Sequence, residues 1–287
     1  MQVVKASGKR VKFSPEKVKK TCLRAGANQV LANQVVKEIE KVIYDGIKTR
    51  DILKLILKLL KQENPAAGIR YQLKKAMLDL GPAGFVFETY TLKLLKAYHY
   101  QAWTPPLMKG ACVQHEVDVI AQAPLEKNNL TDQETGKNNV YMIECKYRNA
   151  AGIRTGLKIA LYTWARFLDL KEREDKNSKV KFTRPWLISN TKFSEAAVQY
   201  ANCKNMRLLG WKFPQGKGLE SLIEEKNLYP ITILNSLDRE TRNKLFSQKI
   251  ILCQDLLEFS LEELKKKLKI KENKLNNLIT QARLIIK

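Results

Sequence analysis

The sequence predicts an α/β protein with a mixed central sheet flanked by helices, preceded by a mainly helical segment with a β-hairpin and followed by an all-α tail. Three observations predict this class. Between residues 85 and 211, short β-rich runs alternate with helical periodicity, whereas the flanking segments show almost only helical periodicity. Glycine and proline break the chain at LGPAG and PQGKG. We therefore expect domains at residues 1–81, 82–214 and 215–287.

The first segment begins with alternating apolar residues. Residues 2–13 predict a β-hairpin that turns at Ser7 and Gly8. Ser14 and Pro15 then begin a helix, as an N-cap followed by a proline at the first helical position does. Helical periodicity continues to residue 80, and Thr49 is expected to cap the helix that follows it.

The middle segment alternates between the two periodicities. A helix is predicted from residue 85 to about residue 98, followed by short strands, a long helix, a strand, a helix from Ser194 and a last strand. The predicted strands lie near 99–103, 115–122, 139–147, 184–189 and 206–211. A polar turn at 128–139 and a charged loop at 171–179 separate elements. The long helix, 153–170, is predicted to bury the stripe Ile153, Leu157, Leu161, Trp164 and Leu168.

Composition limits the partners and the compartment. The 287 residues carry a net charge of +23, spread over all three segments, which favours a polyanionic partner such as nucleic acid over a merely lysine-rich soluble protein. No apolar run approaches the roughly 18 residues of a membrane span, and no signal peptide is recognisable, so we expect a cytoplasmic protein. Five scattered cysteines and two histidines argue against disulfides and zinc.

Charged residues interrupt two of the predicted strands. In NVYMIECKYRN, Glu144 and Lys146 project from the same side of the strand because side chains alternate. Asp118 and Glu116 share one side of an earlier strand, and Glu88 lies one turn into the preceding helix. The carboxylates of Asp118, Glu144 and Glu88 can therefore converge with Lys146, which suits a hard divalent cation such as Mg²⁺. The alternative is a plain ion pair of Glu144 with Lys146 or Arg148.

These residues and their order resemble the PD-(D/E)xK nuclease superfamily. GFVFE at 84–88 and LISNTKFSEAAVQYANCKNMRLLGW at 187–211 resemble parts of Mrr-like restriction endonucleases, and the resemblance covers about 84–214. It implies a nuclease core in which Asp118 and Glu144 bind Mg²⁺ or Mn²⁺, Lys146 is the catalytic lysine and Glu88 is an auxiliary acid. Val117 departs from the motif's proline, and many Mrr-type members have glutamine at the position of Glu144. His115 either assists or lies at the surface.

The N-terminal segment resembles a second family. VVKASGKRVKFSPEK, YDGIKTRDIL and RYQLKKA, in this order within residues 1–80, resemble the ATP-cone, the nucleotide-sensing module of ribonucleotide reductases. The resemblance implies that Lys5, Lys17, Thr49 and Lys74 bind ATP or dATP as a regulatory ligand. No Walker motif is present, so we expect no nucleotide hydrolysis. Val11 and Leu53 replace an acid and a histidine of reductase members. The alternative is a basic module that only binds the DNA backbone.

The tail, 235–287, resembles paired helix-hairpin-helix units with KIKEN in place of a glycine turn. Such units grip DNA phosphates, although a dimerisation role is the alternative. Together the segments predict a Mg²⁺-dependent endonuclease on double-stranded DNA, of a restriction or repair type, regulated by an adenine nucleotide. A homo-dimer or higher oligomer is the assembly we consider. The rival functions are a junction-specific nuclease and a nucleotide-responsive DNA-binding protein whose nuclease domain is a scaffold.

Overall fold

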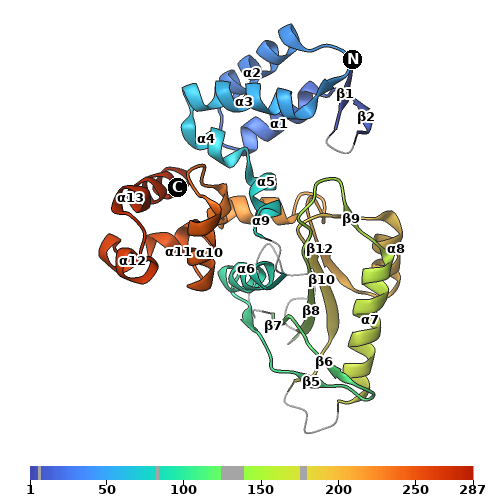
Figure 1. The fold of residues 1–287 in the computed structure, drawn as a ribbon. Coiled ribbons are helices and arrows are strands. Elements are labelled where there is room, and N and C mark those ends of the chain that lie inside the picture. The colour runs from blue at the N-terminus through green and yellow to red at the C-terminus, as the bar shows by residue number, and fades with distance from the viewer. Residues whose placement is uncertain (6–7, 82–83, 124–138, 175–179, 287) are drawn as a thin grey trace. The chain divides into compact units, whose positions relative to one another are not determined.

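The computed structural model describes residues 1–5, 8–81, 84–123, 139–174 and 180–286 (Figure 1). The chain forms two compact units. The first contains residues 1–79, 150–152 and 229–287, and the second contains residues 80–149 and 153–228. Ser7 of the predicted hairpin turn, most of the polar turn at 128–139, the end of the charged loop at 171–179 and residues 82–83 of the LGPAG break lie outside the described residues.

The first unit begins with the predicted hairpin. Strand β1 (Gln2–Val4) pairs antiparallel with β2 (Arg10–Lys12) and parallel with β3 (Ile47–Lys48). Five helices follow or interleave, with Ser14 capping the first through its hydroxyl oxygen. They are α1 (Pro15–Arg24), α2 (Gln29–Val42), α3 (Thr49–Glu63), α4 (Pro65–Arg70) and α5 (Leu73–Leu78). The predicted cap at Thr49 is one residue off, because Lys48 is the N-cap and Thr49 is the first helical residue of α3.

The C-terminal segment of the first unit is helical, as expected. It contains the short 3-10 helix η1 (Ile231–Ile233), α10 (Arg239–Ser247), α11 (Cys253–Leu257), α12 (Leu261–Leu268) and α13 (Glu272–Ile285). Within the KIKEN turn, Lys269 ends α12 in the left-handed conformation, with φ 51°. A lysine therefore occupies the conformation for which helix ends favour glycine.

The second unit contains a five-stranded sheet with the order β12-β10-β8-β7-β4. Its strands are β4 (Gln101–Trp103), β7 (Val119–Gln122), β8 (Val140–Lys146), β10 (Arg184–Ser189) and β12 (Arg207–Leu209). Strands β8, β10 and β12 run parallel, while β7 is antiparallel to both β4 and β8. The mixed central sheet is therefore confirmed. Two strand pairs lie outside it: β5 (Met108–Lys109) with β6 (Gln114–His115), and β9 (Arg154–Thr155) with β11 (Lys192–Phe193).

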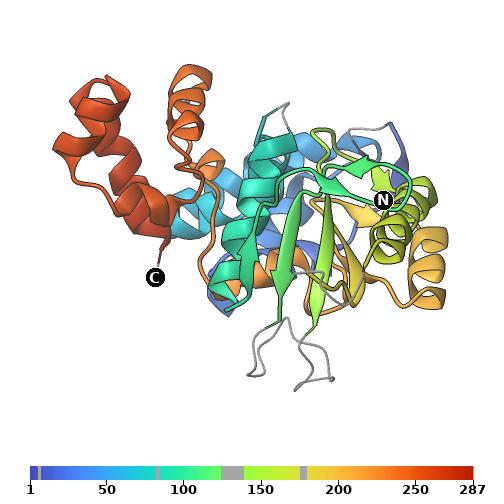
Figure 2. The ribbon, with the colours of Figure 1, turned by 90° about the horizontal axis from the view of Figure 1, so that it is seen from below.

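Helices cover both faces of this sheet. Helix α6 (Gly84–Ala97) lies on one face, and α7 (Leu157–Glu172) and α8 (Glu195–Cys203) lie on the other, as both views show (Figure 1, Figure 2). The short helix α9 (Leu219–Glu225) also belongs to this unit. No helix in the described ranges is long and apolar enough to cross a membrane.

Two sequence predictions for this unit are wrong in detail. The strand expected at 115–122 is interrupted, because β6 ends at His115 and β7 begins only at Val119. The predicted apolar stripe of the long helix is not its buried face, since Ile153, Leu161 and Leu168 are 44%, 44% and 39% exposed. The buried residues of α7 are Ala160, Thr163, Phe167 and Leu170. Two of these are small, which lets the helix approach the sheet closely.

Candidate active site

Asp118 and Glu144 lie side by side at one end of the central sheet. Strands β7 and β8 are antiparallel with Val119 opposite Ile143, so the next position places Asp118 opposite Glu144. The amide of Cys145 donates a hydrogen bond of 2.6 Å to Oδ2 of Asp118, which fixes this carboxylate at the strand. The side chains of Asp118 and Glu144 share the sheet face that packs against α7. The structure therefore brings together the two predicted metal ligands.

Lys146 is the last residue of β8, two positions after Glu144 and on the same side of the strand. The Ser189 hydroxyl donates a hydrogen bond of 2.8 Å to the carbonyl oxygen of Lys146. Thr155 and Thr191 bond to the same serine in a buried hydroxyl cluster. This cluster fixes the backbone at the end of β8, so the position of the lysine depends on a supporting network that the sequence analysis did not identify.

Glu88 reaches the same region from α6. Burial raises the pKa of Glu88 to about 7, and repulsion from the nearby carboxylates of Asp118 and Glu116 raises it further. The helix covers the sheet face opposite to α7. Glu88 and Arg166 of α7 therefore approach the end of the strands from opposite sides.

The ion-pair partner of Glu144 is Arg166, neither Lys146 nor Arg148. Nη1 of Arg166 lies 2.5 Å from Oε2 of Glu144, and both side chains are only 11% exposed. Burial nevertheless raises the pKa of Glu144 to about 7, and Asp118 adds to the rise against the opposing effects of Arg166 and Lys146. Burial likewise raises the pKa of Asp118. The buried carboxyl group of Glu144 and the partly buried ones of Asp118 and Glu88 thus lie near the two cations Arg166 and Lys146.

The two carboxylates fit a magnesium ion whose remaining coordination positions are filled by water and by substrate oxygens. Asp118 and Glu144 supply two carboxylates, whereas no group of three or more histidine, cysteine or acidic side chains in the described ranges is arranged to hold a metal. Mg²⁺ commonly binds one or two carboxylates and keeps water or phosphate oxygens in its other positions. Asp118 and Glu144, at facing positions of two neighbouring strands, supply two such carboxylates.

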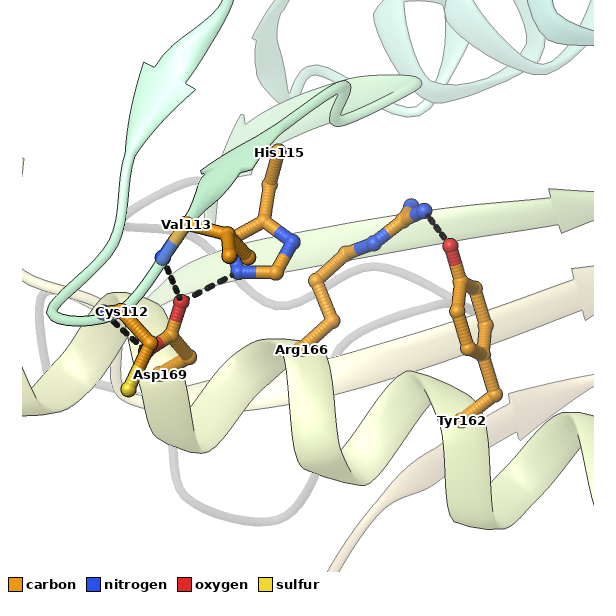
Figure 3. Close-up of polar contacts among 6 residues, drawn as sticks. All are labelled: Cys112, Val113, His115, Tyr162, Arg166 and Asp169. Carbon is orange, nitrogen blue, oxygen red and sulfur yellow. Dashed lines mark hydrogen bonds and ion pairs between the residues drawn. The ribbon is translucent and has the colours of Figure 1, made fainter.

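Three polar residues of α7 make side-chain contacts on one face of the helix (Figure 3). Tyr162, Arg166 and Asp169 follow helical spacing, and Nη2 of Arg166 donates a hydrogen bond to the Tyr162 hydroxyl. Asp169 accepts bonds from the Cys112 amide at 2.7 Å and contacts Nε2 of His115 at 2.6 Å. These contacts lower the pKa of Asp169 to about 2. The spacing of these residues was the signal that the sequence analysis missed.

The predicted nucleotide-binding residues lie in the first unit. Because β1 and β3 are parallel with Val4 opposite Lys48, the next positions place Lys5 beside Thr49, at the start of α3. No side chain caps this helix start, so its first N–H groups are available to an anion. Lys17 is exposed in the first turn of α1. Lys74 is exposed on α5, which packs against η1.

Family models match the two ends of the chain. Residues 1–73 match the model of the ATP cone domain, and residues 229–286 match the model described as AF1548-like, C-terminal. An uncharacterized protein of Archaeoglobus fulgidus is 37% identical over 194 residues, which are 68% of this chain and 98% of that protein. The crystal structure of AF1548, a protein of unknown function, matches with TM-score 0.56 and 35% identity over 70% of this chain and 97% of that one.

These matches bear differently on the three segments. The N-terminal match confirms the ATP-cone resemblance. The tail matches the AF1548-like C-terminal domain, which the sequence analysis had not named. The likeness of residues 84–214 to Mrr-like nucleases stays a prediction.

Proposed function

The chain belongs to the AF1548-like family and begins with an ATP-cone domain, and from this premise we propose that it is a Mg²⁺-dependent DNA endonuclease regulated by an adenine nucleotide. The observation that carries the proposal is the placement of Asp118 opposite Glu144, with Lys146 on the same strand face. This arrangement resembles the metal-binding and catalytic set of PD-(D/E)xK nucleases. The ATP-cone supports adenine-nucleotide binding as the regulatory part of the function.

Each of the four site residues has a role in the proposed phosphodiester hydrolysis. Asp118 and Glu144 would hold Mg²⁺ or Mn²⁺, which supplies Lewis-acid polarisation of the phosphodiester. Lys146 lies on the same face of β8 as Glu144, and its positive charge stabilises the negative charge that develops on the phosphate. Glu88 has a pKa of about 7, so it can exchange a proton with the attacking water or the leaving oxygen near neutral pH.

DNA is the proposed substrate because the chain has a net charge of +23. Lysine and arginine side chains that neutralise phosphates give an affinity that falls with salt, with a log–log slope of about −0.9 per contacted phosphate. The AF1548-like C-terminal domain adds exposed lysines in and around α12, including Lys266 and Lys269. We assign it to sequence-independent DNA binding, and dimerisation is the alternative role.

Cleavage of methylated and unmethylated supercoiled plasmid, with and without Mg²⁺ and ATP or dATP, tests the proposal. We expect Mg²⁺-dependent nicking or linearisation by the wild type. Glu144→Gln and Lys146→Met should each reduce the rate on the order of 100-fold or more while DNA binding persists. Lys158→Met, which changes an exposed lysine of α7, is the matched control and should cleave normally. Equal rates for the wild type and both site variants would refute the nuclease assignment.

A second function is favoured by one observation. Arg166 already neutralises Glu144 at 2.5 Å, as expected where a nuclease fold serves only as a scaffold. A nucleotide-responsive DNA-binding protein would bind duplex DNA without Mg²⁺ and cleave no substrate. A junction-specific nuclease would instead cleave four-way junctions or flaps and leave the plasmid intact. Including both substrates in the assay separates the three functions.

A further inference from the structure

Arg166 is placed to contact two different groups. Its Nη1 contacts the carboxylate of Glu144 at 2.5 Å, and its Nη2 contacts the hydroxyl of Tyr162. The guanidinium carbon also lies over the Tyr162 ring, 4.6 Å from its centre. Glu144 is 8% exposed and Tyr162 is 50% exposed, so the guanidinium extends from the buried acid toward a residue at the surface.

The guanidinium also retains an unused donor. Nε of Arg166 is buried and has no hydrogen-bond partner among the described residues. The nearby acid on the same helix does not supply one, because the carboxylate of Asp169 is engaged by the Cys112 and Val113 amides and by His115 (Figure 3). A buried donor without a partner is costly, so a movement of the guanidinium that gives this donor an acceptor oxygen would be favourable.

Arg166 and a divalent cation compete for the same carboxylate. Asp118 and Glu144 are the two acids at the facing strand positions, so a cation shared between them binds the carboxylate whose charge Arg166 already neutralises through Oε2. We propose that Arg166 holds Glu144 in place in the metal-free protein, is displaced when the cation binds, and then binds a phosphate of the DNA. This inference rests on the proposed function, and it assigns to Arg166 a role in substrate binding.

The chemistry of arginine fits both states. A guanidinium is planar, always charged and able to give two parallel hydrogen bonds, which match a carboxylate and a phosphate equally well. The Tyr162 ring offers the displaced group a cation–π contact at the surface. Lysine would keep the charge at this position but could not span Glu144 and Tyr162 in the same way.

The test compares the wild type, Arg166→Met and Arg166→Lys, with Arg173→Met as the control because Arg173 is an exposed arginine at the end of the same helix. Calorimetry with Mn²⁺ at mildly alkaline pH measures cation affinity on full-length protein whose folding is verified by thermal unfolding. Binding of a linear duplex DNA in Ca²⁺ measures substrate binding without relying on cleavage.

We expect Arg166→Met to lower the melting temperature without metal, to bind Mn²⁺ about tenfold more tightly than the wild type, and to lose most Ca²⁺-dependent DNA affinity. Arg166→Lys should keep near-normal Mn²⁺ affinity with weakened DNA binding, and Arg173→Met should match the wild type. A merely structural arginine would lower the melting temperature and leave both affinities unchanged, which would overturn the inference.

Two further results separate this inference from the proposed function. Weaker Mn²⁺ binding by Arg166→Met would show that the arginine supports the metal ligands, and would overturn the displacement while leaving a nuclease possible. A wild type that binds neither Mn²⁺ nor Ca²⁺ and cleaves no DNA would instead remove the proposed function, and the inference with it.

Discussion

At the residue scale, Glu88 and Glu144 are unusual because both have pKa values of about 7. Burial is the largest cause for each, and repulsion from Asp118 is the second. Each carboxyl group therefore binds a proton more tightly in the folded protein than in the unfolded chain. This excess of bound protons makes the stability of the metal-free protein depend on pH.

The metal-free protein should become less stable as pH rises from about 5 to about 8. A carboxyl group whose pKa is raised by folding stabilises the folded state below its unfolded pKa, and this contribution is lost as pH rises through the folded pKa. Melting temperatures across this range measure the effect. Glu88→Gln should flatten the curve, whereas Glu40→Gln, at an exposed position of α2, should leave it unchanged. A wild-type curve that rises over the same range would contradict the crowding of acids.

Gly110 lies too close to Asp169 for a residue with a side chain. A Cβ atom at this position would lie 2.0 Å from Oδ2 of Asp169, the oxygen that contacts His115. Gly110→Ala should therefore displace the Asp169 carboxylate and destabilise the protein by about 1–3 kcal/mol. Urea denaturation measures this loss. Gly156→Ala is the control, because its Cβ would meet no atom within 4 Å, and it should cost about 1 kcal/mol or less as a helix N-cap.

At the element scale, the sequence predicted the sheet better than the faces of its helices. The predicted strand 184–189 coincides with β10, and 139–147 differs from β8 by one residue at each end. Such strands are identifiable because they are short apolar runs between polar breaks. Helix α7 carries two candidate apolar stripes, and periodicity could not show that small Ala160 and Thr163 permit the closer approach to the sheet.

In the candidate site, too, the residues marked by a local pattern were predictable from the sequence, and those that depend on a distant contact were not. Glu144 and Lys146 were identifiable because charges interrupt an apolar strand, and Asp118 because it precedes another. Arg166 is recognisable as part of the site only by its contact with Glu144, which lies 22 residues earlier in the chain. Nothing local to α7 reveals that contact, although the spacing of Tyr162, Arg166 and Asp169 places their polar side chains on one face of the helix.

The C-terminal end of helix α12 allows the cost of a left-handed lysine to be measured. Lys269 adopts φ 51°, a conformation that costs a residue with a Cβ atom roughly 1–2 kcal/mol. Lys269→Gly should therefore stabilise the protein by about 1 kcal/mol, offset in part by the greater freedom of glycine in the unfolded chain. Denaturant unfolding measures it. Lys266→Gly, at an exposed position inside the same helix, should change stability by about 1 kcal/mol in the opposite direction.

At the scale of the whole molecule, the first unit joins the ATP-cone to the C-terminal domain. Arg70 of α4 is buried, and its Nε and Nη2 donate hydrogen bonds of 3.0 and 2.6 Å to the carbonyl oxygen of Ile285 in the last turn of α13. Thr232 similarly donates to the carbonyl oxygen of Ala76 in α5. The arginine charge also suits the negative end of a helix dipole. The two segments therefore form one packed structure although most of the chain separates them.

This packing predicts that nucleotide binding to the cone is detected in α13. Helix α3 begins at Thr49, beside Lys5, and packs along α4, which ends at Arg70. A nucleotide that orders α3 should therefore favour the arrangement in which Arg70 contacts Ile285. Hydrogen exchange of full-length protein should show increased protection of α13 amides when ATP or dATP is added.

Three variants separate nucleotide binding by the ATP-cone from the transmission of its effect to α13. Lys5→Ala should lose both ATP binding, measured by calorimetry, and the protection of α13. Arg70→Met should still bind ATP but lose the protection, because the carbonyl of Ile285 no longer has its charged donor. Lys37→Met, at an exposed position of α2, should behave as the wild type. Full protection of α13 by ATP in Arg70→Met would show that the signal reaches the C-terminal domain by another contact, and the Arg70 connection would then be structural only.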